Sequence, residues 1–318
     1  MKYLAIQNCQ SEFHWSINWM SKVLEIPRSS YYQWLNRSKT SLELENHQIA
    51  QWIIELDEMF NHILGYRQMT LFINRLNHKS YNQKRIRRIM RLLGIKSVIR
   101  KKKHVYPPSN PEIIANNILA RDFTASEPNQ KWVSDITEFK DRNTKQKLYF
   151  CVILDLYDRS IVSYEISSRN NNELVFKTFE KAMASNPKAK PIFHSDRGFQ
   201  YTSKVFNYKL KSNGLTQSMS RVGHCIDNGP IEGFWGIVKT EMYHHHKYEN
   251  LQELKQAIHN YVYFYNHQRF QSRFKGQTPI EVREIALNSL FVKQYPIKPN
   301  NRIIKYYENI KQKSELIN

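Results

Sequence analysis

Three acidic residues lie in settings that would aim their side chains into one shared site: Asp135, Asp196 and Glu232. Each belongs to a short, largely apolar segment, and the last two have 35 residues between them. Spacing alone is weak evidence, because a chain of 318 residues with 8 Asp and 20 Glu produces such a separation readily by chance. The residues around each acid therefore have to support the interpretation.

Two of the acids lie in segments that predict β-strands. Asp135 is in the middle of Trp132–Phe139, a short run that mixes aromatic and β-branched residues. Asp196 follows the apolar run 191–195, and Gly198 then breaks the pattern, which places this acid at the carboxyl end of a second strand. In open α/β sheets, ligands bind at that edge.

The third acid lies where a helix is expected to begin. Asn228 or Asp227 can cap such a helix and Pro230 can start it, so Glu232 falls in the first turn. Apolar residues at helical spacing predict a buried stripe of Ile231, Phe234, Trp235 and Val238. Lys239 shares a different face with Glu232, so one helix would offer a carboxylate and, two turns later, a cation.

Metal-dependent phosphoryl transfer explains why three acids would be needed together. Such a reaction on DNA can use two metal ions about 3.5–4 Å apart, and carboxylate oxygens suit Mg²⁺. We therefore expect three metal ligands that repel one another without metal, so that at least one titrates abnormally high. The alternative is that the two Asp are loop or capping residues and that Glu232 only favours a helix N-terminus. This alternative stays open for any single acid, but it explains the three acids together less well.

Three runs around the acids, WVSDITEF, HSDRGFQY and DNGPIEGFWGIVKTE, resemble known catalytic motifs. They are similar to those of retroviral-integrase-like DDE transposases, in particular the second-frame (OrfB) proteins of the IS-three family of bacterial insertion sequences. The resemblance extends to ILGYRQMTLFINRL, to the segment up to IRKKKH and to YFYNHQRFQSRFKGQTPIEVRE, and so covers roughly residues 15–285. One departure is the segment 270–274, FQSRF, where many relatives have a His and a Leu.

This resemblance implies a fold and a set of site residues. The fold class is α/β: a ribonuclease H-like integrase catalytic core, an all-α helix-turn-helix amino-terminal region and a carboxy-terminal helical extension. Asp135, Asp196 and Glu232 match the family's catalytic triad, which would bind two Mg²⁺ ions that Mn²⁺ can replace. Lys239 matches a basic position expected to approach DNA.

The amino-terminal third carries the most concentrated positive charge. Ten Lys and Arg and no acid lie between Lys84 and Lys103. Tyr66–Leu76 and a second helix capped by Asn82 and stopped by Gly94 predict a helix-turn-helix, whose second helix can enter a major groove. Its expected apolar stripe is Ile86, Ile89, Met90 and Leu93, and the expected DNA contacts are Lys84, Arg85, Arg87, Arg88, Arg91, Lys101, Lys102 and Lys103. The alternative is a solvated basic face on a packing helix.

The pattern of elements predicts five parts of the chain. These are a short helical, helix-turn-helix-like element (1–40), a basic helix-turn-helix-like DNA-binding domain (41–105), a linker (106–128), an integrase-like core (129–247) and a carboxy-terminal helix and tail (248–318). In the core we expect strand, strand, strand, helix, strand, helix, strand, helix. The expected elements after the first strand are 147–156, 160–167, 172–184, the run ending at Asp196, 203–213, 215–219 and the helix of Glu232.

Further positions in the core invite a functional interpretation. Asp155, near a strand end, is the main rival for a metal ligand, but we assign it to the turn that follows, with a supporting role left open. His244, His245 and His246 resemble a metal tract, yet consecutive helical residues point about 100° apart and do not converge on one ion. Arg269, at the end of a long aromatic helix, is a further expected DNA contact.

Composition agrees with a DNA-binding protein. The net charge of +20 and a pI near 9.7 imply a polyanionic partner, and nucleic acid is favoured over a membrane because no apolar run has transmembrane length. Three cysteines far apart offer neither a disulfide framework nor a zinc pattern, which fits a reducing cytosol. We expect a soluble cytoplasmic protein that is nucleoid-associated when bound to DNA.

The resulting hypothesis is a transposase that binds the ends of a mobile element, cuts strands and joins a 3′-hydroxyl to target phosphate. The expected partners are double-stranded DNA, further copies of the chain on that DNA, and no membrane. The resemblance also implies an upstream-frame OrfA-type helix-turn-helix and coiled-coil protein, as a partner or a frameshift fusion. Two alternatives remain: a hydrolytic nuclease with the same core, and an inactive DNA-binding regulator.

Overall fold

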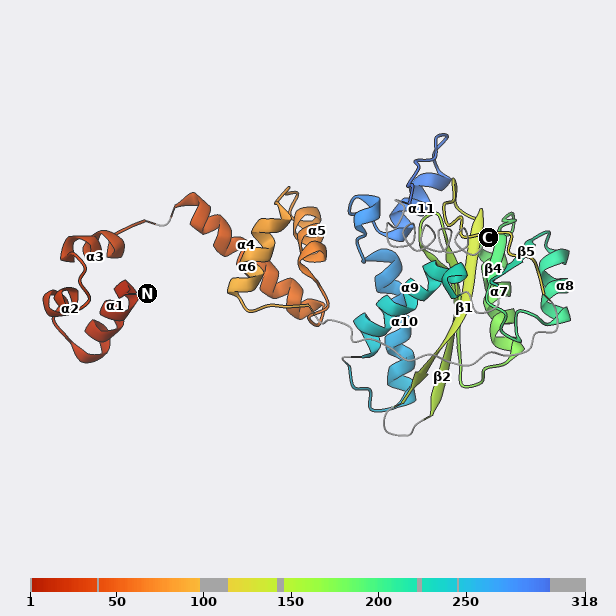
Figure 1. Ribbon diagram of the computed structural model, residues 1–318, viewed down its shortest axis with the longest axis horizontal. Coiled ribbons are helices and arrows are strands. Elements are labelled where there is room, and N and C mark those ends of the chain that lie inside the picture. The colour runs from red at the N-terminus through yellow and green to blue at the C-terminus, as the bar shows by residue number, and fades with distance from the viewer. Residues whose placement is uncertain are drawn as a thin grey trace, which may run out of the picture. The chain divides into compact units, whose positions relative to one another are not determined.

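The computed structural model describes residues 2–38, 40–97, 114–141, 146–221, 225–244 and 246–297, without the side chain of Cys225. The chain forms two compact units, which divide between Glu55 and Leu56 inside a long helix, α4 (Ser41–Met59). Each unit is described by itself (Figure 1). The five-part division of the chain stays a prediction beside this observed one.

The first unit is helical. It contains α1 (Lys2–Phe13), α2 (Ile17–Val23), α3 (Arg28–Leu35) and most of α4. Its small core consists of Ile6, Met20 and Tyr31. In α1 only Ile6 is buried, so this helix has no apolar stripe that a sequence pattern can detect.

The helix-turn-helix prediction is confirmed in the second unit by α5 (Tyr66–Leu76) and α6 (Gln83–Leu92). The Asn82 side chain accepts a hydrogen bond from the Lys84 backbone N–H at 2.8 Å and caps α6. Gly94, with φ +71°, ends the helix in the left-handed conformation that glycine adopts easily. The buried face is Ile86, Ile89 and Met90, whereas Leu93 lies at the carboxyl cap and is exposed.

A five-stranded sheet forms the centre of the catalytic core. Its strands are β1 (Lys131–Lys140), β2 (Lys147–Asp155), β3 (Ile161–Ser167), β4 (Ile192–Ser195) and β5 (Thr216–Met219). They lie in the order β3-β2-β1-β4-β5, with β1 to β3 antiparallel and with β4 parallel to both β1 and β5. The predicted order of strands and helices is confirmed, and so is the mixed α/β architecture.

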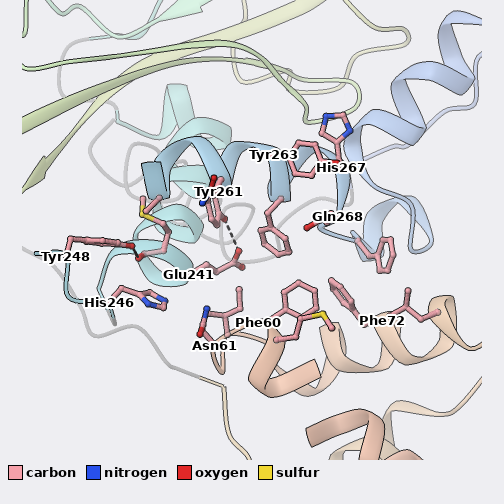
Figure 2. Close-up of a pocket in the computed structure, with 18 residues that line it drawn as sticks. Phe60, Asn61, Phe72, Glu241, His246, Tyr248, Tyr261, Tyr263, His267 and Gln268 are labelled. Atoms are coloured by element: carbon pink, nitrogen blue, oxygen red, sulfur yellow. Dashed lines mark hydrogen bonds between the residues drawn. The ribbon is translucent and has the colours of Figure 1, made fainter. Parts of the chain in front are cut away.

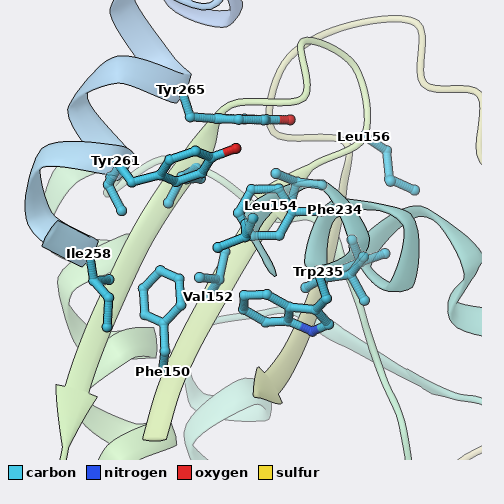
Figure 3. Packing of buried hydrophobic residues seen from close by; sticks show 14 of the residues in the cluster. Phe150, Val152, Leu154, Leu156, Phe234, Trp235, Ile258, Tyr261 and Tyr265 are labelled. Atoms are coloured by element: carbon cyan, nitrogen blue, oxygen red, sulfur yellow. The ribbon is translucent and has the colours of Figure 1, made fainter. Parts of the chain in front are cut away.

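Helices cover both faces of this sheet. One face packs against α7 (Asn172–Ser185) and α8 (Lys204–Ser212). The other face packs against α9 (Gly229–Val238), α10 (Leu251–His267) and α11 (Pro279–Leu287). Neighbouring residues of a strand point to opposite faces, so Cys151 and Val152 of β2 lie in different cores. Figure 3 shows the core that contains Val152, in which residues of α9 and α10 pack against β2. Burial on both faces explains why β2 reads as a continuous apolar run.

Three short helical turns complete the description: Cys225–Asn228, which leads into α9, a π-helix at Lys239–Tyr243, and Ser272–Phe274. The α-helix of Glu232 therefore stops at Val238, and Lys239 opens a wider turn rather than a continued α-helix. Within the part of the chain that the structure describes, no helix is long and apolar enough to cross a membrane.

Candidate active site

Two of the three predicted acids meet on neighbouring strands. β1 and β4 run parallel, and Ser134 lies opposite Ser195 in their register. Asp135 follows Ser134 in the middle of β1, and Asp196 follows Ser195 just beyond the end of β4. The sheet thus brings together two carboxylates that are far apart in the sequence, at the edge where open α/β sheets bind ligands.

Asp196 is held by the loop that follows it. The Gly198 backbone N–H donates a hydrogen bond to Asp196 Oδ1 at 2.9 Å. A Cβ atom at position 198 would lie 3.0 Å from that oxygen and 3.1 Å from Gln200 Oε1, so this close approach requires glycine. The side chain of Asp196 is exposed, yet the protein atoms crowded around its carboxyl group displace water and raise its pKa.

Asp135 is half-buried and fixed from two sides. Its Oδ1 accepts a hydrogen bond from the Ile136 backbone N–H at 2.8 Å, and its Oδ2 accepts one from Trp235 Nε1 at 2.8 Å. Burial, followed by repulsion from the charge of Asp196, raises the pKa of Asp135 to about 8, and Glu232 adds a smaller repulsion. This agrees with the expectation that one acid of the group titrates abnormally high.

Glu232 lies in the first turn of α9, as predicted, and its side chain is exposed. One turn later Trp235 anchors the same helix to β1 through its bond to Asp135, and its ring packs against Phe150 with centroids 5.4 Å apart (Figure 3). The helix therefore presents Glu232 from a fixed position. Desolvation by nearby protein atoms raises the pKa of this glutamate as well.

The start of α9 differs from the predicted cap. Asn228 occupies the N-cap position, but its side chain makes no capping bond; instead Nδ2 donates to the Ser134 carbonyl oxygen at 3.3 Å. Asp227 does not cap either, because Arg121 and Arg221 bind its carboxylate at 2.5 and 2.9 Å. Asn228 Oδ1 is buried without a hydrogen-bond partner, directly beside the strand of Asp135.

The three acids form a pair and a nearby third group rather than a closed triad. Among the described residues, no Lys, Arg or His forms an ion pair with any of the three. In the same residues, no three His, Cys, Asp or Glu side chains are arranged to hold one metal ion together. The edge of the sheet thus gathers negative charge that this part of the chain does not neutralise.

Asp155, the rival acid, has a structural environment. It is fully buried and accepts hydrogen bonds from the Asn129 and Tyr157 backbone N–H groups at 2.7 and 2.9 Å. Arg283 of α11 binds it at 3.0 Å and binds Asp158 at 2.9 Å. Asp155 is the last residue of β2, and its bonds to the turn that follows and to Arg283 satisfy its carboxylate within the fold.

The predicted DNA contacts fall into several environments. On α6, Lys84, Arg87, Arg88 and Arg91 are exposed, whereas Arg85 is half-buried with its guanidinium 5.2 Å from the centre of the Tyr81 ring. Lys239 is half-buried, with its ammonium 5.9 Å from the centre of the Phe139 ring. Lys101, Lys102 and Lys103 lie outside the described residues, as does His245 of the histidine run.

Arg269 does not lie open to DNA as expected. Its side chain is 12% exposed, and its guanidinium binds Glu241, with Nη2 and Oε1 2.7 Å apart. Glu241 also accepts a hydrogen bond from the Tyr261 hydroxyl at 2.8 Å, in the wall of an aromatic groove of about 800 Å³ (Figure 2). The π-helical turn and the end of α10 bury this ion pair between them, so we assign Arg269 to the fold.

Sequence reasoning missed residues that act over long separations. Arg283 is 128 residues from Asp155, and Trp235 is 100 residues from Asp135, so no local pattern joins them. The helix of Arg283 did carry a detectable signal. Thr278 and Glu281 form a capping box ahead of an apolar run, with Pro279 at the first position.

Comparison with known proteins agrees with this architecture. Two models of the integrase core domain match residues 125–225 and 232–287, and a model of an HTH-like domain matches residues 43–103. The first two ranges include all three acids between them, and the third includes α5 and α6.

Relatives among curated proteins match most of their own length. An uncharacterised transposase-like protein of Haemophilus influenzae is 41% identical over 65% of this chain and 95% of its own. The putative transposase InsK of insertion sequence element IS150 from Escherichia coli K12 is 35% identical over 82% of this chain and 91% of its own. The transposase InsF of IS3A from the same strain is 30% identical over 88% and 97%. The chain therefore belongs to the OrfB-type DDE transposases of the IS-three family, whose integrase core cuts and joins DNA in transposition.

Proposed function

We propose that Asp135, Asp196 and Glu232 are the acids that bind divalent metal for this reaction. The observation that supports the proposal is the uncompensated charge at their edge of the sheet. Two fully buried carboxylates of the core, Asp155 and Asp227, are each bound to arginine. Asp135, in contrast, is half-buried beside the like charges of Asp196 and Glu232 and pairs with no cation of the described chain. A partly desolvated charge beside like charges is costly unless it is paired, so these acids point to a cation from outside the chain.

The donor set fits Mg²⁺, and we propose two ions, with Mn²⁺ able to replace them. All three groups offer hard carboxylate oxygens, and the buried Asn228 Oδ1 without a partner adds an amide oxygen beside them. Mg²⁺ keeps several waters and binds through one or two carboxylates together with substrate phosphates. Each ion therefore needs only part of the acid group, which accords with the absence of a three-ligand cluster in the described residues.

The protein groups have separate tasks in this scheme. Asp135 is held on both oxygens by Ile136 and Trp235, so it is the rigid member of the site. Asp196 and Glu232 remain exposed and accessible to a DNA phosphate. Bound divalent ions would activate the attacking oxygen and stabilise the leaving one.

The DNA partner is proposed to contact α6 and the exposed Lys84, Arg87, Arg88 and Arg91. Contacts of such residues to phosphate position a protein on the duplex, whereas base contacts specify sequence. We further propose that several copies act together on the element ends, and that an upstream-frame OrfA-type protein assists them. These assignments follow the five domains that we predict from the sequence.

The experiment that tests the acids incubates the protein, alone and joined to its upstream partner, with labelled element-end DNA and Mg²⁺. Wild type and Asp196→Asn are compared, with Asp141→Asn as a control acid outside the site. Cleavage and joined product are expected from wild type and from the control, and neither from Asp196→Asn. Cleavage without joining would favour the nuclease alternative. If wild type and Asp196→Asn both bind DNA tightly and give the same cleavage and joining products, the proposal is contradicted.

A further inference from the structure

Some of the buried polar atoms that lack a hydrogen-bond partner belong to the turn after β2 and to the loop after α10. In the described part of the chain they include Ser160 Oγ, Gln271 Nε2 and Arg273 Nε. Each of the three can donate a hydrogen bond. Buried donors are nearly always satisfied in native proteins, and a group of exceptions suggests that a water or an ion binds there.

Several contacts place these atoms in one neighbourhood. Near the end of α10, the Asn266 side chain accepts a hydrogen bond from the Ile161 N–H at 2.9 Å and donates one to the Ile161 carbonyl at 3.0 Å. This pair of bonds fixes the carboxyl end of α10 beside the start of β3 and therefore beside Ser160. The centre of the Tyr295 ring lies 4.9 Å from the centre of the Phe274 ring and 5.9 Å from that of the Tyr157 ring. Residues of the turn 157–160 and of the loop 271–274 thus pack against the same ring, that of Tyr295.

Arg159 adds an unpaired cation to this group. It sits in the turn with φ +62° and is half-buried. Its guanidinium makes no hydrogen bond or ion pair with the described residues. Burial, followed by repulsion from Arg273, lowers the pKa of Arg159 to about 10. Asp155 and Asp158 attract it, but Arg283 already binds both carboxylates.

Only some of the hydrogen-bond donors of the Arg273 guanidinium have a partner. Its Nη2 donates to the Tyr295 carbonyl oxygen at 2.7 Å, which leaves the buried Nε without an acceptor. Other buried arginines of this unit bind carboxylates: Arg121 with Asp227, Arg269 with Glu241, and Arg283 with Asp155 and Asp158. Arg159 and Arg273 repel each other, and neither forms an ion pair with a carboxylate of the described chain. Together with the unpaired donors of Ser160 and Gln271, they have the chemistry of an oxyanion site.

We propose that Arg159, Gln271 and Arg273, with the Ser160 hydroxyl, bind a phosphate group of the DNA backbone. A phosphodiester offers only acceptor oxygens and a negative charge, which matches a set made of donors and cations. The side chains of both arginines and of Gln271 are half-buried, whereas the Ser160 hydroxyl is buried. A phosphate would therefore be met first by the Arg159 guanidinium and would draw the buried donors of Ser160, Gln271 and Arg273 toward it. The inference rests on the proposed action on DNA and adds a contact to the core, separate from α6.

The test compares wild type with Arg159→Gln in equilibrium binding of labelled duplex DNA over a series of salt concentrations without metal. Lys211→Gln is the matched control, because Lys211 is exposed on α8 and its loss changes the charge equally. For Arg159→Gln we expect about tenfold weaker binding at about 0.1 M salt, and a slope of log K against log salt that is smaller by about one. Lys211→Gln is expected to stay near wild type in both quantities.

Folding and the source of the anion are checked separately. Since Arg159 makes no hydrogen bond within the described residues, Arg159→Gln is expected to melt at the wild-type temperature, and Arg159→Lys is expected to recover part of the salt slope. Inorganic phosphate without DNA serves as a probe of a free anion. If phosphate stabilises wild type but not Arg159→Gln while their salt slopes agree, a free anion occupies the site and the DNA contact is wrong.

An unchanged salt slope together with no effect of phosphate would overturn the site altogether and leave water as the occupant. Failure here is distinct from failure of the proposed acids. Asp196→Asn is expected to lose cleavage while keeping the wild-type salt slope, whereas Arg159→Gln is expected to retain cleavage when DNA is saturating.

Discussion

The core contains two pairs of aspartates, and a cation of the described chain binds only one of them. Asp155 and Asp158 are fully buried, and Arg283 binds both within 3.0 Å. Asp135 lies on β1 and Asp196 just beyond the end of the adjacent strand β4, and no cation of the described chain pairs with them. The first pair ties α11 to the sheet and needs nothing further. The second pair is the one that we propose for metal binding, so one sheet would use the same residue type for structure and for chemistry.

The largest effect is expected from Asp196→Asn. Loss of one proposed metal-binding carboxylate should lower strand cleavage by about 10³-fold or more. Thermal unfolding without metal should show equal or greater stability, because the substitution removes repulsion between Asp135 and Asp196. Cleavage is followed on labelled DNA and unfolding by circular dichroism. A large loss of stability would place this aspartate with the structural pair.

The converse substitution, Arg283→Met, tests the neutralised pair. It leaves two buried carboxylates without their cation and should lower the free energy of unfolding by about 3–5 kcal/mol, measured by urea denaturation. Adding Asp155→Asn and Asp158→Asn to this variant should restore part of the loss. If Arg283→Met is neutral, the contrast between the two pairs does not hold.

Trp235→Phe is expected to act through the position of Asp135. The ring packing against Phe150 is largely kept, but the N–H that binds Asp135 Oδ2 is lost. Groups that orient metal ligands typically contribute 10–100-fold to metal affinity or activity. We expect a loss of that size in cleavage, with a higher Mg²⁺ concentration for half-maximal rate and nearly unchanged DNA binding. Phe234→Leu, which changes packing but not this bond, should leave the Mg²⁺ requirement as in wild type.

The smallest effect concerns pH. Because the pKa of Asp135 is raised to about 8 from an ordinary value of 3.8, the folded state binds the proton more tightly than the unfolded state. The contribution of this residue to stability therefore decreases as pH rises from about 4 to about 8 without metal. Asp227 is the opposite case: its arginines lower its pKa, so its contribution is present above the ordinary value of 3.8 and lost as pH falls below it.

Melting temperatures of metal-free wild type and Asp135→Asn over this pH range test the sign. The difference between them should change with pH in the direction stated, and saturating Mg²⁺ should remove the change in wild type. Parallel curves for the two proteins would mean that Asp135 does not carry the unpaired charge.

Much of the fold follows from local sequence. Helix α5 has the predicted bounds, Asn82 and Gly94 delimit α6, and Pro230 places Glu232 in the first turn of α9. These features depend on residues within a few positions of one another, so a pattern reveals them. Asn228 occupies the predicted N-cap position of α9, but neither candidate makes a capping bond, since the Asn228 amide binds Ser134 and Asp227 binds Arg121 across 106 residues.

The sequence by itself determined the kind of chemistry: three acids in two strand settings and one helix start, within a strongly basic chain. The tertiary structure decided which charges are used and where. It paired Arg283 with Asp155 and Asp158, buried Arg269 against Glu241, fixed Asp135 with Trp235, and left Asp135 and Asp196 without a cation from the residues that the structure describes. The physical reason is that pairing and desolvation depend on distance in space, and strand register and helix packing, rather than spacing along the chain, set that distance.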